Sequence, residues 1–155
     1  MKKKPVIVTI VIVAAAAILI GGGIYLYPHL VERTVSQVVK NDMTDVVQID
    51  FFNANNGRRA EVTNKEDIDE TIQLIKNLKA KKSFDQGEVS GNGLIITLTT
   101  SNGKKISISC WLFIRGVKYE FNEREKESRD NIRDYLVEKY GLNEWPEEEM
   151  AEAAE

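Results

Sequence analysis

The side chains best suited to acid–base chemistry in this sequence are four carboxylates, Asp50, Glu61, Glu88 and Glu120. Two carboxyl groups held together in a pocket can serve as general acid and general base in a hydrolytic reaction. However, the sequence contains no motif that pairs a nucleophile with a base, and nothing in the spacing of these carboxylates separates them from ordinary surface charge. We therefore expect a protein that is not an enzyme, with a carboxylate-based hydrolytic enzyme as an alternative.

Histidine and cysteine each occur once, as His29 and Cys110. One chain with a single histidine and a single cysteine cannot build a usual zinc ligand set. Cys110 lies in the alternating stretch 106–112, where a small buried apolar side chain is expected. His29 follows an apolar segment and is expected to be an interfacial side chain rather than a catalyst. The sequence thus predicts neither a metal nor a cofactor.

A binding surface is indicated by three apolar side chains, Ile95, Trp111 and Phe113. In the region 94–121, alternate apolar residues are expected to face the core, and these three fall on the opposite, mostly polar face. Apolar patches on otherwise polar faces are typical of contact surfaces. The alternative is that another segment of the chain covers them. This patch is our candidate for contact with a protein, a peptide or an envelope component.

The elements that must position this patch follow from the pattern of apolar residues. Segments with the alternation of β-strands are 46–52, 58–63, 94–100, 105–114 and 117–121. Helical periodicity and capping residues predict helices at 65–79 and 122–141. The sequence therefore predicts an α+β domain over 45–143, with a mainly antiparallel sheet of about five strands and two helices packed on one face.

Residues 5–27 contain no charged side chain and follow three lysines. A helix of this length is about 34 Å long, enough for a hydrocarbon core of about 30 Å. We interpret it as a retained transmembrane anchor, and a secreted protein with a cleaved signal peptide is the alternative. The aromatic exit suits a membrane interface, and Gly23 stands where a lipoprotein signal needs cysteine. The lysines predict a cytoplasmic N-terminus and an extracytoplasmic remainder.

The anchor and the ends of the domain carry further signals. Gly21, Gly22 and Gly23 would let another membrane helix approach closely, so a membrane-tethered subunit of an envelope complex is a further alternative. Residues 28–44 are expected to form a stalk, as either helix or strand. The segment 144–155 holds six glutamates and no basic residue and is expected to be a disordered tail. Residues 28–155 have a net charge of −6, which argues against nucleic acid as a partner.

A lysine-rich start, one apolar span and a compact α+β domain together resemble small uncharacterised single-pass membrane-anchored extracytoplasmic proteins of Gram-positive bacteria. The resemblance is one of architecture and composition, without a diagnostic motif, so it implies a cell-surface location and no functional residues. We therefore expect a membrane-anchored extracytoplasmic binding or interaction module.

Overall fold

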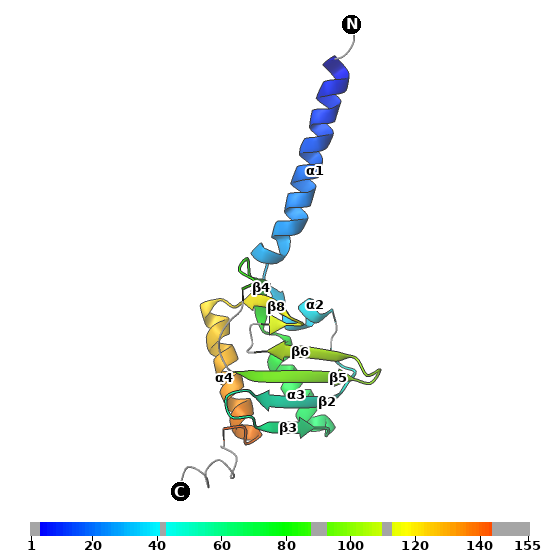
Figure 1. The fold of residues 1–155 in the computed structure, drawn as a ribbon. Helices are drawn as coiled ribbons and strands as arrows, with labels where there is room; N and C mark the ends of the chain where they lie inside the picture. Colours follow the sequence, from blue (N-terminus) through cyan, green and yellow to red (C-terminus); the bar gives the residue numbers. More distant parts are fainter. Residues whose placement is uncertain (1–3, 41–42, 88–92, 110–112, 144–155) are drawn as a thin grey trace.

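The computed structural model describes residues 4–40, 43–87, 93–109 and 113–143. A long apolar helix, α1 (Lys4–Leu30), stands away from a domain built of one sheet and shorter helices (Figure 1). The helices of the domain are α2 (Val35–Val39), α3 (Lys65–Lys76) and α4 (Glu123–Lys139). The tail 144–155 lies outside the described residues.

The domain is organised around a sheet of eight strands in the order β1-β4-β8-β7-β6-β5-β2-β3, with every neighbouring pair antiparallel. The strands are β1 (Arg33–Thr34), β2 (Val46–Asn53), β3 (Arg59–Val62), β4 (Lys79–Lys82), β5 (Leu94–Thr100), β6 (Lys105–Ser109), β7 (Phe113–Ile114) and β8 (Val117–Glu120). The predicted α+β class and antiparallel sheet are confirmed. The predicted number of about five strands is too low.

Two segments fold differently from the sequence prediction and add strands to the sheet. The helix predicted over 65–79 ends at Lys76, and Lys79–Lys82 is instead strand β4, which pairs with β1 and β8. Ladder hydrogen bonds on both sides of β4 outweigh the helix propensity of its lysines. The single strand predicted over 105–114 is two strands, because β6 and β7 pair with each other and the chain reverses between Ser109 and Phe113. Cys110 lies outside the described residues.

The segment 28–44, predicted as a stalk, contributes structure to the domain. Thr34 caps α2, with its hydroxyl accepting a hydrogen bond from the backbone N–H of Gln37. Val35 and Val39 of this short helix are buried in the core. The backbone N–H of Val35 also donates to the carbonyl oxygen of Leu78, 2.9 Å away. Only a short connection therefore separates α1 from the folded domain.

The core lies between one face of the sheet and helices α3 and α4. Figure 1 shows α3 behind the sheet and α4 along its side. Phe51 is 1% exposed and its ring stacks on that of Tyr140, with centroids 4.7 Å apart. The buried residues on this inner face of the central strands include Ile49, Phe51, Leu94, Ile96, Leu98, Ile106, Ile108 and Ile114. The predicted inward-facing positions of β5 and β6 are thus confirmed.

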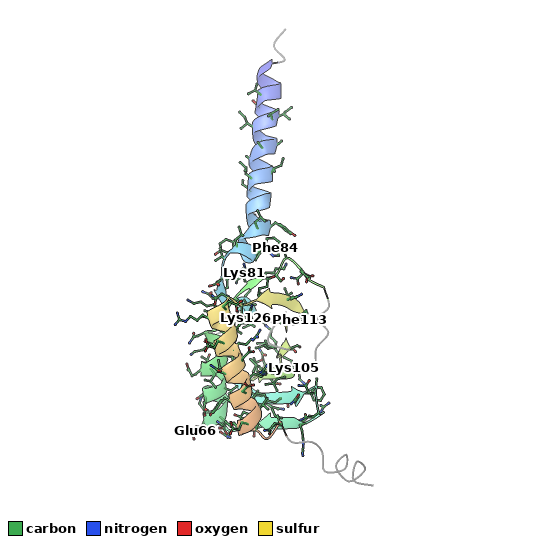
Figure 2. The ribbon with its side chains drawn as sticks, turned by 90° about the vertical axis from the view of Figure 1, so that its left-hand side faces the viewer. Glu66, Lys81, Phe84, Lys105, Phe113 and Lys126 are labelled. Atoms are coloured by element: carbon green, nitrogen blue, oxygen red, sulfur yellow. The ribbon has the colours of Figure 1, made fainter. Side chains whose placement is uncertain are left out.

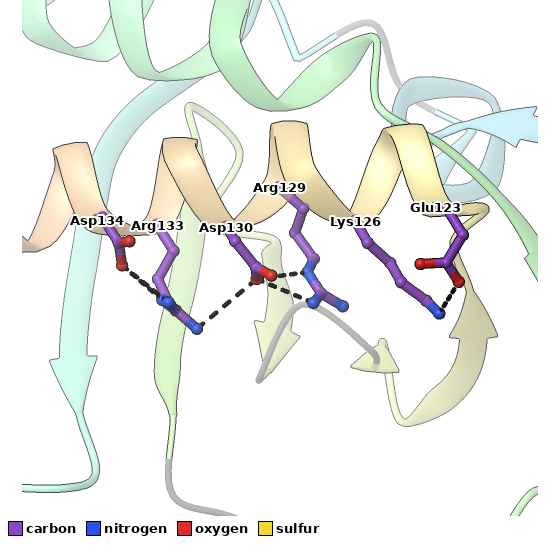
Figure 3. A network of polar contacts seen from close by, with 6 residues as sticks. All are labelled: Glu123, Lys126, Arg129, Asp130, Arg133 and Asp134. Carbon is purple, nitrogen blue, oxygen red and sulfur yellow. Dashed lines mark hydrogen bonds and ion pairs between the residues drawn. The ribbon is translucent and has the colours of Figure 1, made fainter.

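Helix α4 begins after Asn122, one of its two candidate caps with Ser128, and presents a charged face to solvent. The side-chain oxygen of Asn122 accepts a hydrogen bond from the backbone N–H of Glu125. Figure 3 shows the ion pairs on this face, in which the partners are one or three positions apart along the helix. Exposed pairs of this kind each contribute only a few tenths of a kcal/mol. These charged side chains keep one face of the helix in water, while the opposite face packs on the domain core through buried Leu136.

Lys139 joins α4 to α3 through two carboxylates. Its Nζ lies 2.7 Å from Asp67 Oδ1 and 2.8 Å from Glu70 Oε2. The pKa of Asp67 is lowered, first by a hydrogen bond from Asn64 and then by Lys139. The pKa of Glu70 is lowered by hydrogen bonds from Lys139 and Tyr135. Both carboxylates therefore favour their ionised forms in the folded chain.

This arrangement predicts that part of the domain's stability is lost at acidic pH. The ordinary pKa values are 3.8 for Asp67 and 4.5 for Glu70, and folding lowers both, so the unfolded chain binds more protons in this range. Their contribution to stability is complete above about pH 4.5 and is lost as the pH falls through the lowered values. Lys139→Met should make the fall in urea midpoint between pH 5 and pH 2 shallower. An unchanged pH profile in this variant would contradict the assignment, and Lys65→Met, on the exposed pair with Asp69, is the control.

Candidate functional site

The sheet face turned away from α3 carries one continuous row of side chains across six strands. Strand register places each member opposite the next: Phe52 faces Ile95, Ile95 faces Ser109, and Ser109 faces Phe113. Directly paired residues in antiparallel strands project from the same face of the sheet. We call this set the outer row; from β3 to β8 its members are Arg59, Phe52, Ile95, Ser109, Phe113 and Lys118.

The outer row has an apolar middle and a basic residue at each end. Phe52, Ile95 and Phe113 are all partly exposed. The guanidinium of Arg59 lies over the Phe52 ring, 4.6 Å from its centroid, which is the geometry of a cation–π contact. At the other end, the Lys118 side chain is only 14% exposed, and its Nζ lies 2.8 Å from Asp85 Oδ2. Both basic ends are therefore held in place by neighbours.

A groove of about 670 Å³ lies beside this row over strands β2, β3, β5 and β6. Asp50 and Glu61 are direct cross-strand partners and line the same groove. The Asp50 carboxylate also accepts a hydrogen bond from Gln48 Nε2, at 2.9 Å. The side chains that give the groove its character are Asp50, Phe52, Arg59, Glu61, Ile95 and Lys105. Both signs of charge and two apolar side chains thus meet on an open sheet face.

The four carboxylates suggested by the sequence are only partly brought together. Glu120 lies on β8, two strands beyond the groove's edge at β6, and accepts a hydrogen bond from Ser83 Oγ. Glu88 is outside the described residues. The structure therefore juxtaposes Asp50 with Glu61 and leaves Glu120 apart.

Comparisons with protein-family models, with curated proteins and with solved structures found no match. Within the described part of the chain, no group of three or more His, Cys, Asp and Glu side chains is arranged to hold a metal ion.

The structure describes two of the three residues of the apolar patch suggested by the sequence. Ile95 and Phe113 lie in the same row, on strands separated only by β6, while Trp111 is outside the described residues. Sequence reasoning missed Phe52 and Arg59 as further members. The signal was present in the adjacent pair Phe51 and Phe52, since neighbouring residues in a strand must point to opposite faces.

Helix α1 offers a second candidate contact, independent of the sheet. Its segment Val8–Leu30 is long and apolar enough to cross a membrane, and its apolar window is not buried against the protein, unlike a core helix. A signal sequence would pass the same test of length and composition. A Cβ added at Gly21, Gly22 or Gly23 would meet no other atom within 4 Å, so this stretch of the helix is open on all three positions.

Proposed function

We propose that the protein is a membrane-anchored binding module, with the outer row as its contact surface for an extracytoplasmic protein or peptide. The observation that carries this proposal is the alignment of Phe52, Ile95 and Phe113 across an open sheet face, next to the stacked guanidinium of Arg59. Aromatic side chains and arginine are the residue types most enriched at binding hot spots. An apolar centre with polar surroundings is the usual anatomy of such an interface.

The shape of the row indicates the kind of partner. Six neighbouring strands spaced about 4.8 Å apart give a row of roughly 24 Å, the length of an extended peptide of about seven residues. The acidic pair Asp50 and Glu61 and the basic residue Lys105 border the row in the groove. A partner segment with two or three apolar side chains and polar groups between them would match both features.

The anchor supplies the location in this proposal. Lysines precede the apolar span, and the positive-inside rule favours a cytoplasmic N-terminus with the domain outside the cell. Retention of the span is supported by the direct packing of its last turn against the domain. The hydrogen bond between His29 Nδ1 and the Lys82 carbonyl oxygen, 3.0 Å long, is one of these contacts.

Two other candidates rest on narrower observations. The open glycine stretch of α1 favours a subunit that contacts partners through its membrane helix. The juxtaposition of Asp50 and Glu61 favours a carboxylate-based hydrolase. We place the enzyme behind the binding module because substrate sites usually enclose most of the ligand, whereas this groove lies on an open sheet face.

Site-specific photo-cross-linking of the full-length chain in its native membrane tests the binding proposal. A photoreactive phenylalanine analogue at position 113 should form a discrete adduct, because Phe113 is one of the three apolar members of the contact surface. Phe52→Ala in the same chain should reduce the adduct about tenfold or more, as expected for loss of an aromatic hot spot. The adduct band and its partner are measured by gel shift and mass spectrometry.

Control positions distinguish the candidates. The same analogue at Val47, which is exposed but lies outside the outer row, should give no adduct. An adduct formed at Leu19 and not at position 113 would favour contact through the anchor helix. Equal cross-linking at positions 113 and 47, unchanged by Phe52→Ala, would remove the outer row as the binding surface.

A further inference from the structure

The last turns of α1 meet the domain through three aromatic rings, of which His29 and Phe84 are stacked and Tyr25 is tilted against His29. The His29 ring lies 4.2 Å from the Phe84 ring between centroids, with planes 14° apart, and 5.4 Å from the Tyr25 ring. His29 is 3% exposed, and its Nδ1 lies within hydrogen-bond distance of the Lys82 carbonyl oxygen at the end of β4. We call Tyr25, His29 and Phe84 the aromatic junction; Figure 2 shows Phe84 where α1 meets the domain.

The loop that carries Phe84, residues 83–87, is held by several hydrogen bonds. The Ser83 N–H donates to the Lys118 carbonyl oxygen at 3.0 Å, and Gln86 Oε1 accepts from the Lys118 N–H at 3.1 Å. Gln86 Nε2 also donates to the Ser83 carbonyl oxygen, and Asp85 pairs with the Lys118 ammonium. The loop is therefore built to hold its conformation rather than to adjust around Phe84.

Despite this support, Phe84 remains largely uncovered. Its exposure of 59% is the highest among the large apolar side chains described outside α1. An aromatic ring displayed by an ordered loop is typical of a side chain that is covered by something outside the domain. Because Phe84 lies beside the end of the apolar span, the membrane surface is the covering partner to consider.

The depth of Phe84 relative to a bilayer follows from helix geometry. Tyr25 and Tyr27 are exposed near the end of α1, where aromatic side chains mark the edge of the hydrocarbon core. His29 lies four residues beyond Tyr25, a rise of about 6 Å along the helix. The headgroup layer on each side of a bilayer is roughly 5–7 Å thick. Phe84, stacked on His29, therefore lies at the level of the headgroups.

We propose that Phe84 and the loop 83–87 dock into the headgroup region of the same bilayer that α1 spans. This inference rests on the membrane anchorage in the proposed function. The aromatic ring provides the main contact: Asp85 and Lys118 neutralise each other, Lys81 lies opposite Glu120 in the β4–β8 pair, and Lys82 lies opposite Tyr119. Docking therefore requires no anionic lipid and resists high salt.

Docking would also set the direction of the outer row. In Figure 1 the strands follow one another down the page from the end of α1, with β4 and β8 nearest to α1 and β3 farthest from it. The outer row crosses these strands, so it runs away from the bilayer, from Lys118 near the surface to Arg59. A partner segment that rises from the same membrane would lie along it.

Fluorescence of the full-length chain in vesicles tests this docking. An environment-sensitive fluorophore is attached to a cysteine at position 84 in a Cys110→Ala background, in neutral phosphatidylcholine vesicles with and without lipids that carry a quencher near the headgroup. We expect a blue-shifted label that is quenched several-fold more than the same label at Val47. Adding 0.5 M salt or anionic lipid should leave this difference unchanged.

Two further labelled positions make the outcome decisive. A label at Asp85 keeps the Phe84 ring and its contact with His29, although it removes the Asp85–Lys118 ion pair, and in neutral vesicles it should be quenched like the label at position 84. A label at Leu19 reports on the span. If Leu19 is protected within the bilayer while positions 84 and 85 behave like Val47, docking is overturned and anchorage stands. If Leu19 itself is accessible to water, both docking and anchorage are overturned.

Discussion

Phe51→Ala is expected to destabilise the domain by about 3–5 kcal/mol, the range found when a fully buried phenylalanine is truncated. Phe51 is 1% exposed in the centre of β2, and its ring stacks on Tyr140 at the end of α4. Alanine would leave a cavity between the sheet and α4 and would remove an aromatic contact. Urea unfolding of the full-length chain in detergent micelles, followed by circular dichroism, measures this loss as a lower midpoint.

The adjacent residue offers a matched control. Phe52 has the same side chain but projects from the outer face, where it is partly exposed and contacts Arg59. Phe52→Ala should cost no more than about 1 kcal/mol, since exposed sites away from the core tolerate truncation. A cost for Phe52→Ala equal to that of Phe51→Ala would mean that the outer face is covered, and it would remove the basis for a contact surface there.

Simultaneous replacement of Asn53 and Asn56 by alanine is expected to have the second largest effect. Both side-chain amides donate to the Leu142 carbonyl oxygen, at 2.8 Å each, and so tie the chain after α4 to the end of β2. Asn53 is 7% exposed and Leu142 is fully buried. Loss of both donors would leave a buried carbonyl without these partners, which costs about 1–3 kcal/mol beyond the lost hydrogen bonds.

A double-mutant cycle separates this effect from the single losses. Each single variant leaves one amide donor on the Leu142 carbonyl, so Asn53→Ala and Asn56→Ala should each cost about 1 kcal/mol. The double variant should lose more unfolding free energy than the two single variants together, by a coupling of about 0.5–3 kcal/mol. Urea midpoints of the four proteins, converted to free energies of unfolding, measure this coupling. Strict additivity would show that the two amides act independently of the shared carbonyl.

Most central elements of the fold could be predicted from local pattern. The turn at Gly103 is not the type I′ turn expected of an Asn-Gly pair, because Gly103 has a positive φ and Asn102 does not. Strands β2 and β5, in contrast, alternate clearly, and Asn122, one of two candidate caps with Ser128, caps α4. In these places, the local preference and the tertiary environment agree. The edge of the sheet formed by β1 and β4 was harder to predict, because these are short polar strands whose sequences have no alternation to recognise.

Only part of the candidate site could be predicted from the sequence. Ile95 and Phe113 could be assigned to the outer face by alternation, but their arrangement in one row depends on the register of β5, β6 and β7. The reversal of the chain between Ser109 and Phe113 moves Phe113 onto a separate strand opposite Ser109. No local pattern shows which residue of one strand will face a given residue of another.

The sequence by itself determined the apolar span, the α+β class and the alternation that divides core from surface, because each depends on the order of side chains along the chain. The tertiary structure alone decided the outer row, the packing of residues 28–40 into the domain and the aromatic junction. Phe84 lies far from His29 in sequence, and their stacking follows only from the place of β4 beside the end of α1. Contacts between distant segments depend on strand order and register, which many sequences with the same local pattern could satisfy differently.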